Sequence, residues 1–271
     1  MAEPVRKTGK PWVPEREVFE EAEERSVLQR WVKGPDGEME LLELSLTPEL
    51  FLDPELDDKM VQGEWHDLTG VEISVLLRNH FRLQPDVRVF HDLKHLLGPG
   101  LPAPAPDVSV VRGIHDPEPL DSLDLAKEGV RPSLVIEVVS PLSARVRQTD
   151  LDRKVKLYQR VGIPEYLIAD ATRRRPGRRF TLLGYRLDAA GNYRSIEPDS
   201  QGRFLSETIG IWFQVSPDGQ RIFLFEYPSG RRLLSLTEEE ERANREAEAR
   251  RAAEMEVARL RAELERLRGG A

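Results

Sequence analysis

The sequence predicts an α/β fold with a mixed central β-sheet flanked by helices, followed by a separate C-terminal helix. A continuous apolar strand over residues 134–139 precedes a helical pattern and then a second strand over 165–170. This order is typical of a crossover unit. From Thr237 to Arg268 the composition changes to Glu, Arg and Ala, without Gly or Pro, which indicates an independent helix.

The composition limits the class of protein. Cysteine is absent, and 40 basic against 48 acidic side chains give a net charge of −8. Disulfide scaffolds, thiolate zinc sites and cysteine nucleophiles are therefore excluded. A protein with this net negative charge does not attract nucleic acid as a whole, so any polyanion site must be a local cluster of basic residues. No apolar run approaches the ~18–20 residues of a membrane span, and we expect a cytoplasmic protein without a membrane partner.

The elements of the first half follow from apolar spacing and proline. The first sixty residues predict a partly ordered lead-in, because their apolar clusters alternate too weakly to define elements. Helical spacing predicts a helix over 66–83, and a short strand over 87–90 comes next. Prolines exclude regular structure between 99 and 106, and a strand begins at Val108. The expected domain boundaries are 1–60, 61–235 and 236–271.

The second half continues with strands and ends in the helix. Strands over 180–187, 211–215 and 222–227 extend or flank the sheet. In the tail, apolar residues are spaced alternately by four and three positions, which is the heptad pattern of a coiled coil. They are Ala253, Val257, Leu260, Leu264 and Leu267. The earlier part, 242–251, has little apolar seam, so the number of partner chains stays open.

Two segments resemble known motifs but fail on chemistry. Gly98-Pro-Gly100-Leu-Pro-Ala103 has the letters of a dinucleotide fingerprint, yet its prolines remove the amides that would bind phosphate. His91 and His95 have the spacing of a zincin helix, but Asp92 stands where that motif needs Glu. We interpret both segments as loops or strand ends.

A spaced set of two acids and a lysine remains. Asp107 stands at the entry to a strand, and Glu137 interrupts an apolar strand. Lys154 lies on the next helix, four residues from both Asp150 and Tyr158, so the three share one helical face. A carboxylate inside an apolar strand must be paired, neutral or bound to a cation. Two carboxylates at adjacent strand ends predict a Mg²⁺ or Mn²⁺ site, which is suited to phosphate chemistry.

Each of these residues also has an ordinary structural interpretation. Asp107 could cap the turn after the proline run. Glu137 could pair with Arg131 or Arg153. Lys154 could be a solvated lysine whose partner is Asp150.

The surrounding motifs resemble a known family. They are Pro-Asp107-Val-Ser-Val-Val, Leu-Val-Ile-Glu137-Val-Val-Ser-Pro and Gly162-Ile-Pro-Glu-Tyr-Leu-Ile-Ala-Asp170, with the Lys154 helix between the last two. Together they resemble the Uma-type restriction endonuclease family, a bacterial branch of the PD-(D/E)XK nuclease superfamily. The resemblance covers about Trp65 to Asp170. It implies a restriction-endonuclease-like core and a magnesium-dependent endonuclease that hydrolyses phosphodiester bonds, with DNA as the expected substrate and RNA left open.

The resemblance also implies roles for single residues. Asp107 and Glu137 match the two acids that bind metal. The superfamily pattern places a lysine two residues after the second acid, where this chain has Val139. The resemblance therefore implies that the catalytic lysine has moved to the next helix, where Lys154 is the candidate. An acid from the first helix often joins such sites, and Glu64 and Glu72 are both open.

Basic residues near this segment are candidates for contacts to nucleic acid, although a solvated turn is the alternative. They are Arg145, Arg147, Arg153, Lys156, Arg173, Arg174, Arg175, Arg178 and Arg179. No groove-reading module is evident, so no sequence preference is predicted.

The competing hypothesis is a catalytically inactive nuclease-like module that binds nucleic acid or assembles through its coiled coil. Val139 in the lysine position favours it, whereas the retained acids and Lys154 oppose it. Cleavage of both strands of a duplex needs two active sites, and an inactive module could also assemble through its coiled coil. A homodimer is therefore expected under either hypothesis.

Overall fold

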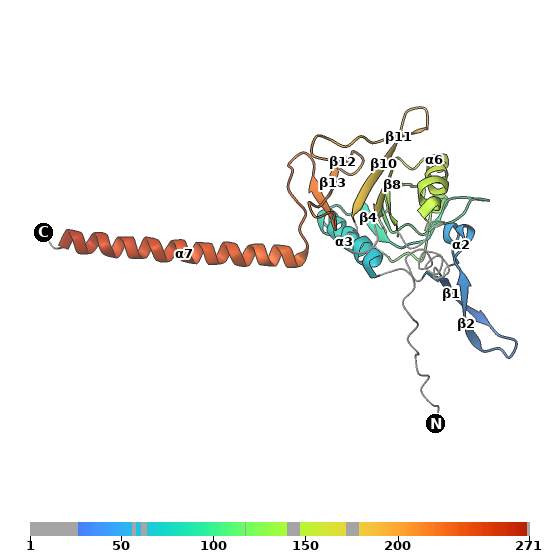
Figure 1. Cartoon of the computed structure of the whole chain (residues 1–271), viewed down its shortest axis with the longest axis horizontal. Coiled ribbons are helices and arrows are strands. Elements are labelled where there is room, and N and C mark those ends of the chain that lie inside the picture. Colours follow the sequence, from blue (N-terminus) through green and yellow to red (C-terminus); the bar gives the residue numbers. More distant parts are fainter. Residues whose placement is uncertain are drawn as a thin grey trace, which may run out of the picture. The chain divides into compact units, whose positions relative to one another are not determined.

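The computed structural model describes residues 27–55, 58–60, 64–116, 118–139, 147–171 and 179–269 (Figure 1). The chain divides into two units, Met1–Arg231 and Arg232–Ala271. The division falls close to the predicted boundary between residues 235 and 236.

A six-stranded mixed sheet forms the centre of the first unit. Its strand order is β11-β10-β9-β8-β6-β4, and β8 and β9 are its parallel pair. The strands are β4 (Val87–His91), β6 (Val108–Arg112), β8 (Pro132–Val139), β9 (Glu165–Ala171), β10 (Phe180–Leu187) and β11 (Tyr193–Ser195). The parallel pair is the predicted crossover unit, so the predicted mixed α/β class is confirmed.

Helices cover both faces of this sheet. The connection from β8 to β9 contains a π-helical turn, η1 (Thr149–Lys154), which continues directly into α6 (Val155–Val161). On the other side lies α3 (Glu64–Phe81), which begins and ends two residues before the predicted helix (Figure 1). Gly162 ends α6 in the left-handed conformation, with φ 75°, as a glycine allows.

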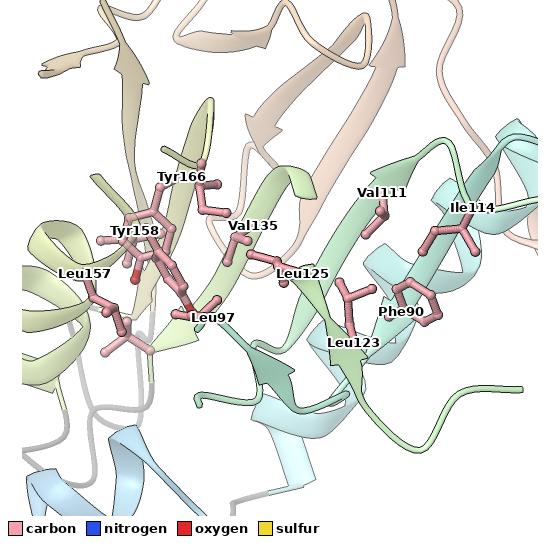
Figure 2. Packing of buried hydrophobic residues seen from close by; sticks show 13 residues of the cluster. Phe90, Leu97, Val111, Ile114, Leu123, Leu125, Val135, Leu157, Tyr158 and Tyr166 are labelled. Atoms are coloured by element: carbon pink, nitrogen blue, oxygen red, sulfur yellow. The ribbon is translucent and has the colours of Figure 1, made fainter. Parts of the chain in front are cut away.

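The sequence of β8 is a continuous apolar run because the strand is buried on both of its faces. Val135 and Val139, two pleats apart, belong to one buried cluster with Tyr158 of α6 and Tyr166 of β9. Figure 2 shows Val135, Tyr158 and Tyr166 near one another, at the end of the cluster away from Phe90 and Ile114. Residues 134, 136 and 138 are also buried, on the opposite face. Since side chains alternate along a strand, Glu137 must point to the same side as Val135 and Val139, toward α6.

Several smaller elements surround the sheet. They are β1 (Val27–Lys33), β2 (Met39–Ser45), α2 (Pro48–Leu52), β3 (Lys59–Met60), β5 (His95–Leu96), β7 (Leu123–Asp124), α4 (Leu125–Glu128), β12 (Arg203–Ser206), β13 (Ile211–Val215) and β14 (Ile222–Glu226). The region expected to be a partly ordered lead-in thus contains a three-stranded sheet, β2-β1-β3. Its pattern was too weak to predict because β2 is exposed on both faces.

The second unit consists largely of α7 (Leu236–Gly269), as the change in composition predicts. Its 34 residues are dominated by Glu and Arg. Within the described ranges, no helix has both the length and the apolar content needed to cross a membrane.

The two motif-like segments do not adopt the secondary structure of the motifs they resemble. Residues 98–103 form neither helix nor strand. His91 ends β4 and His95 lies in β5, and Asp92 between them has φ 51°, so the two histidines do not share a helix. The loop and strand-end interpretation is confirmed.

His95 makes the folding stability depend on pH. Its side chain is completely buried, and Nε2 lies 3.1 Å from the Ser109 hydroxyl. Burial lowers the pKa of His95 from 6.5 to about 3. His95 is therefore protonated near pH 6.5 in the unfolded chain but only near pH 3 in the folded chain. The free energy of unfolding should fall as the pH drops through this window, by up to ~1.4 kcal/mol per pH unit from this group.

Urea unfolding of the wild type and His95→Gln between pH 8 and pH 5 checks this prediction. The difference in stability between the two proteins should narrow toward pH 5, because only the wild type loses stability through His95. A difference that stays constant over this range would refute the assignment.

Candidate active site

The structure brings Asp107, Glu137 and Lys154 together. In the antiparallel ladder of β6 and β8, Val108 pairs with Ile136, which places Asp107 opposite Glu137 at the next position. The Asp107 carboxylate accepts a hydrogen bond from the backbone N–H of Val138, with a distance of 2.6 Å. Lys154, at the end of η1, places Nζ 3.0 Å from Glu137 Oε1. Three separate segments therefore supply one compact charged cluster.

Lys154 is not the solvated lysine of the ordinary interpretation. Its side chain is 1 % exposed, and Nζ also lies 2.9 Å from Asp150 Oδ1. The ring of Phe51 in α2 covers the ammonium group, with Nζ 4.1 Å from the ring centroid. The shared helical face predicted for Asp150 and Lys154 is confirmed, but Phe51 has no signal in the sequence.

Glu137 uses partners other than the two arginines considered from the sequence. The Tyr158 hydroxyl donates to its Oε1 at 3.0 Å, and Lys154 contacts the same oxygen. Arg131 instead donates to the Val161 carbonyl, and Arg153 forms an ion pair with Glu49. The interpretation of Glu137 as the partner of either arginine is wrong, because both side chains are engaged on other elements.

Asp107 is more than a turn residue, because it also contacts a histidine that sequence reasoning missed. His66 in the first turns of α3 is buried, and its Nε2 lies 3.3 Å from Asp107 Oδ2. Gly70, one turn later, lets His91 and Asp107 pack closely against the backbone of α3. A Cβ atom there would lie 3.1 Å from His91 Nε2 and 3.7 Å from Asp107 Cβ. A glycine inside a helix is costly, so Gly70 was the available signal of close packing on this helix face.

The charges of this cluster are strongly coupled. Burial raises the pKa values of Glu137 and Asp150, although the positive charge of Lys154 opposes the rise. Burial alone would lower the pKa of Lys154, but the surrounding carboxylates raise it above its ordinary value, so the amine stays charged. Burial would likewise raise the pKa of Asp107, yet the charge and hydrogen bond of His66 hold it below its usual range.

The chemistry of the donor set fits a small divalent cation. The cluster holds three buried carboxylates, Asp107, Glu137 and Asp150, against the two basic groups Lys154 and His66. An added positive charge would relieve this excess of acid, whose cost appears in the raised pKa of Glu137. Among the described residues, no group of three or more His, Asp or Glu side chains is placed to hold a metal ion by itself. Mg²⁺ commonly binds through one or two carboxylates and takes its other ligands from water and phosphate.

Of the remaining candidates, those that the structure describes have other partners or positions. Glu72 is ion-paired with Arg221, and the side chain of Glu64 is outside the described part. Arg147 binds Asp170 through two hydrogen bonds of 3.1 and 2.6 Å, and Lys156 pairs with Asp152. Arg179 directly precedes β10. The predictions for the other arginines fall outside the described residues: Arg145, Arg173, Arg174, Arg175 and Arg178.

Comparison with known proteins gives two findings. The model of the Uma2 family, described as "Putative restriction endonuclease", matches residues 40–216. Among solved structures, a "putative nuclease belonging to DUF820" from Anabaena variabilis matches with 19% identity and a TM-score of 0.36. That match covers 53% of this chain and 75% of the other. No curated protein matches.

Proposed function

The chain belongs to the Uma2 restriction endonuclease family, and from this premise we propose that it is a metal-dependent endonuclease that hydrolyses phosphodiester bonds in DNA. Asp107 and Glu137 are the proposed metal ligands, and Lys154 is the proposed catalytic cation. The supporting observation is that a charged lysine from the next helix lies 3.0 Å from Glu137, although Val139 occupies the lysine position of the strand.

Each residue of the cluster has a defined task in this proposal. Mg²⁺ or Mn²⁺, when bound, polarises the phosphate and lowers the pKa of a bound water. Asp107 and Glu137 would hold it, together with the Val138 carbonyl. Lys154 would orient the attacking water and offset the negative charge that gathers on phosphate in the transition state. Tyr158 fixes one Glu137 oxygen through its hydroxyl.

The exposed fractions indicate the side from which phosphate approaches. The Asp107 side chain is 11 % exposed, compared with 2 % for Glu137 and 1 % for Lys154. A phosphate group would therefore reach the cluster from the side of Asp107. Lys154 contacts both Glu137 and Asp150 from its buried position, so in this proposal it acts next to the metal that Glu137 would hold.

Plasmid cleavage tests the proposal. The wild type should nick or linearise supercoiled DNA with Mg²⁺ or Mn²⁺ and lose this activity in EDTA. Asp107→Ala, Glu137→Ala and Lys154→Ala should all be inactive. Equal cleavage by all four proteins would end the proposal. DNA binding without any cleavage by the wild type would instead support the inactive nuclease-like module.

His66 gives a second, graded prediction. It contacts Asp107, a proposed metal ligand, so in this proposal it acts by orienting that carboxylate. Groups that orient metal ligands commonly contribute about 10–100-fold to metal affinity or activity. His66→Ala should therefore cleave about 10–100-fold more slowly at low Mg²⁺ and partly recover at high Mg²⁺.

A Mg²⁺ titration of the cleavage rate measures this effect. The exposed His115 provides the matched control, because His115→Ala should leave the titration curve unchanged. A His66→Ala curve that coincides with the wild type would show that His66 has no positioning role.

A further inference from the structure

The C-terminal helix α7 carries an apolar stripe on an otherwise charged surface. At 1.5 Å per residue, its 34 residues extend for ~50 Å. Val257, Leu260 and Leu264 are spaced by three and four residues and are 47%, 46% and 53% exposed. Such spacing places them on one side of the helix, where each leaves about half of its surface in water. The stripe is the kind of seam that a second helix covers.

The residues of the stripe favour a pair of helices. In a heptad frame Val257 and Leu264 take position a and Leu260 takes position d. A β-branched residue at a with leucine at d favours two-stranded coiled coils. Toward the N-terminus the same frame places Glu239, Glu246 and Arg250 on the seam, so the pairing is confined to the end of the helix, from about residue 253.

The charges beside the stripe distinguish the two possible orientations. Position g holds Glu256 and Glu263, whereas position e holds Glu254, Arg261 and Arg268, and Glu254 faces the uncharged Ala249 in a parallel pair. In a parallel pair each g residue faces the e residue five positions further along the other helix. This places Glu256 opposite Arg261 of the partner subunit, and Glu263 opposite Arg268 of the partner subunit.

The antiparallel pair has the opposite electrostatics. When its apolar residues stay in register, g faces g and e faces e. Glu256 then faces Glu263, and Arg261 faces Arg268, so every flanking pair is repulsive. Like charges across such an interface select against a wrong partner or orientation.

We propose that two copies of this chain associate through residues 253–268 as a parallel, in-register coiled coil. The inference depends on the stripe and its flanking charges and is independent of the catalytic proposal. Parallel pairing attaches both Met1–Arg231 units to the same end of the coiled coil, so a dimer presents two copies of the Asp107 site from one end. Its failure would leave the cleavage chemistry untouched.

Sedimentation equilibrium and single-cysteine crosslinking of the full chain test this orientation. The chain contains no cysteine, so each introduced thiol is unique. Val257→Cys places two thiols face to face in the parallel pair. In the antiparallel pair they are about ten residues, or ~15 Å, apart along the axis. Met255→Cys, on the outer face of the helix, is the matched control because it is equally remote from the core.

The expected result is twice the 31.0 kDa chain mass, with disulfide formation about tenfold or more faster for Val257→Cys than for Met255→Cys. A monomeric mass would overturn the proposal. A dimer in which Val257→Cys crosslinks no faster than the control would also overturn it, as would a trimeric mass.

Discussion

Replacing Lys154 with methionine is expected to abolish cleavage and to destabilise the fold at the same time. The ammonium group lies within 3.0 Å of both Glu137 and Asp150, and all three side chains are buried. Its removal leaves two carboxylates without their cation, which commonly costs about 3–5 kcal/mol. Loss of a charge that stabilises the transition state should reduce kcat by ~10²–10³-fold or more. Plasmid cleavage and thermal denaturation measure the two effects.

Lys156 provides the matched control for this substitution. It lies two residues away, is 74 % exposed and forms an ion pair with Asp152 on the surface. Lys156→Met should therefore change stability by less than about 0.5 kcal/mol and leave kcat unchanged. Cleavage is compared well below the melting temperature, where circular dichroism shows that Lys154→Met is folded. If folded Lys154→Met cleaves at the wild-type rate, the proposed role of Lys154 is wrong.

The fold could be predicted where its signals are local. The apolar run of β8, the helical spacing before Gly162 and the run of β9 lie within forty residues, and each follows a short-range rule of pattern. The same short range placed Asp150 and Lys154 on one helical face. Glu137 could be singled out because a carboxylate in an apolar strand needs a partner wherever that partner comes from.

The rest of the cluster depends on contacts that no local pattern encodes. His66 reaches Asp107 across 41 positions of sequence, and Phe51 covers Lys154 from more than a hundred positions away. A histidine and a phenylalanine are common core residues, so neither stands out until the chain is folded. The small β2-β1-β3 sheet was missed for a related reason. Its strand β2 exposes residues on both faces and lacks the alternation that a half-buried sheet imposes.

The buried charged cluster also illustrates why a functional site can lower the stability of the fold. Three carboxylates share one buried region with one lysine and one histidine, an arrangement that a purely structural core would avoid. Sites selected for chemistry often retain such costs. The two buried acids of the crossover unit, Glu137 and Glu165, differ in this respect. Glu165, at the start of β9, is also buried but has a complete set of hydrogen-bond donors. Arg186, the Glu207 backbone N–H and the Thr208 hydroxyl all bind it.

Glu137→Gln should consequently lose activity while gaining stability. Glutamine keeps the shape of the side chain and an oxygen that can accept from Tyr158, but it removes one of the three buried negative charges. Lys154 keeps Asp150 as its counterion. We expect cleavage to fall by ~10³-fold or more, as for the loss of a key transition-state interaction. The melting temperature measured without Mg²⁺ should rise by about 2–4 °C, which corresponds to about 1 kcal/mol.

Glu165→Gln is the matched control, and its effects should have the opposite pattern. The Glu165 carboxylate is fully buried but accepts from a charged arginine, so the loss of its charge weakens bonds worth about 1.5–3 kcal/mol each. This variant should melt earlier and still cleave at temperatures where it is folded. Thermal shifts on adding Mg²⁺ give a readout besides activity, because a ligand stabilises only a protein that binds it. Mg²⁺ should raise the melting temperature of the wild type and Glu165→Gln, and a similar rise for Glu137→Gln would remove Glu137 from the proposed metal site.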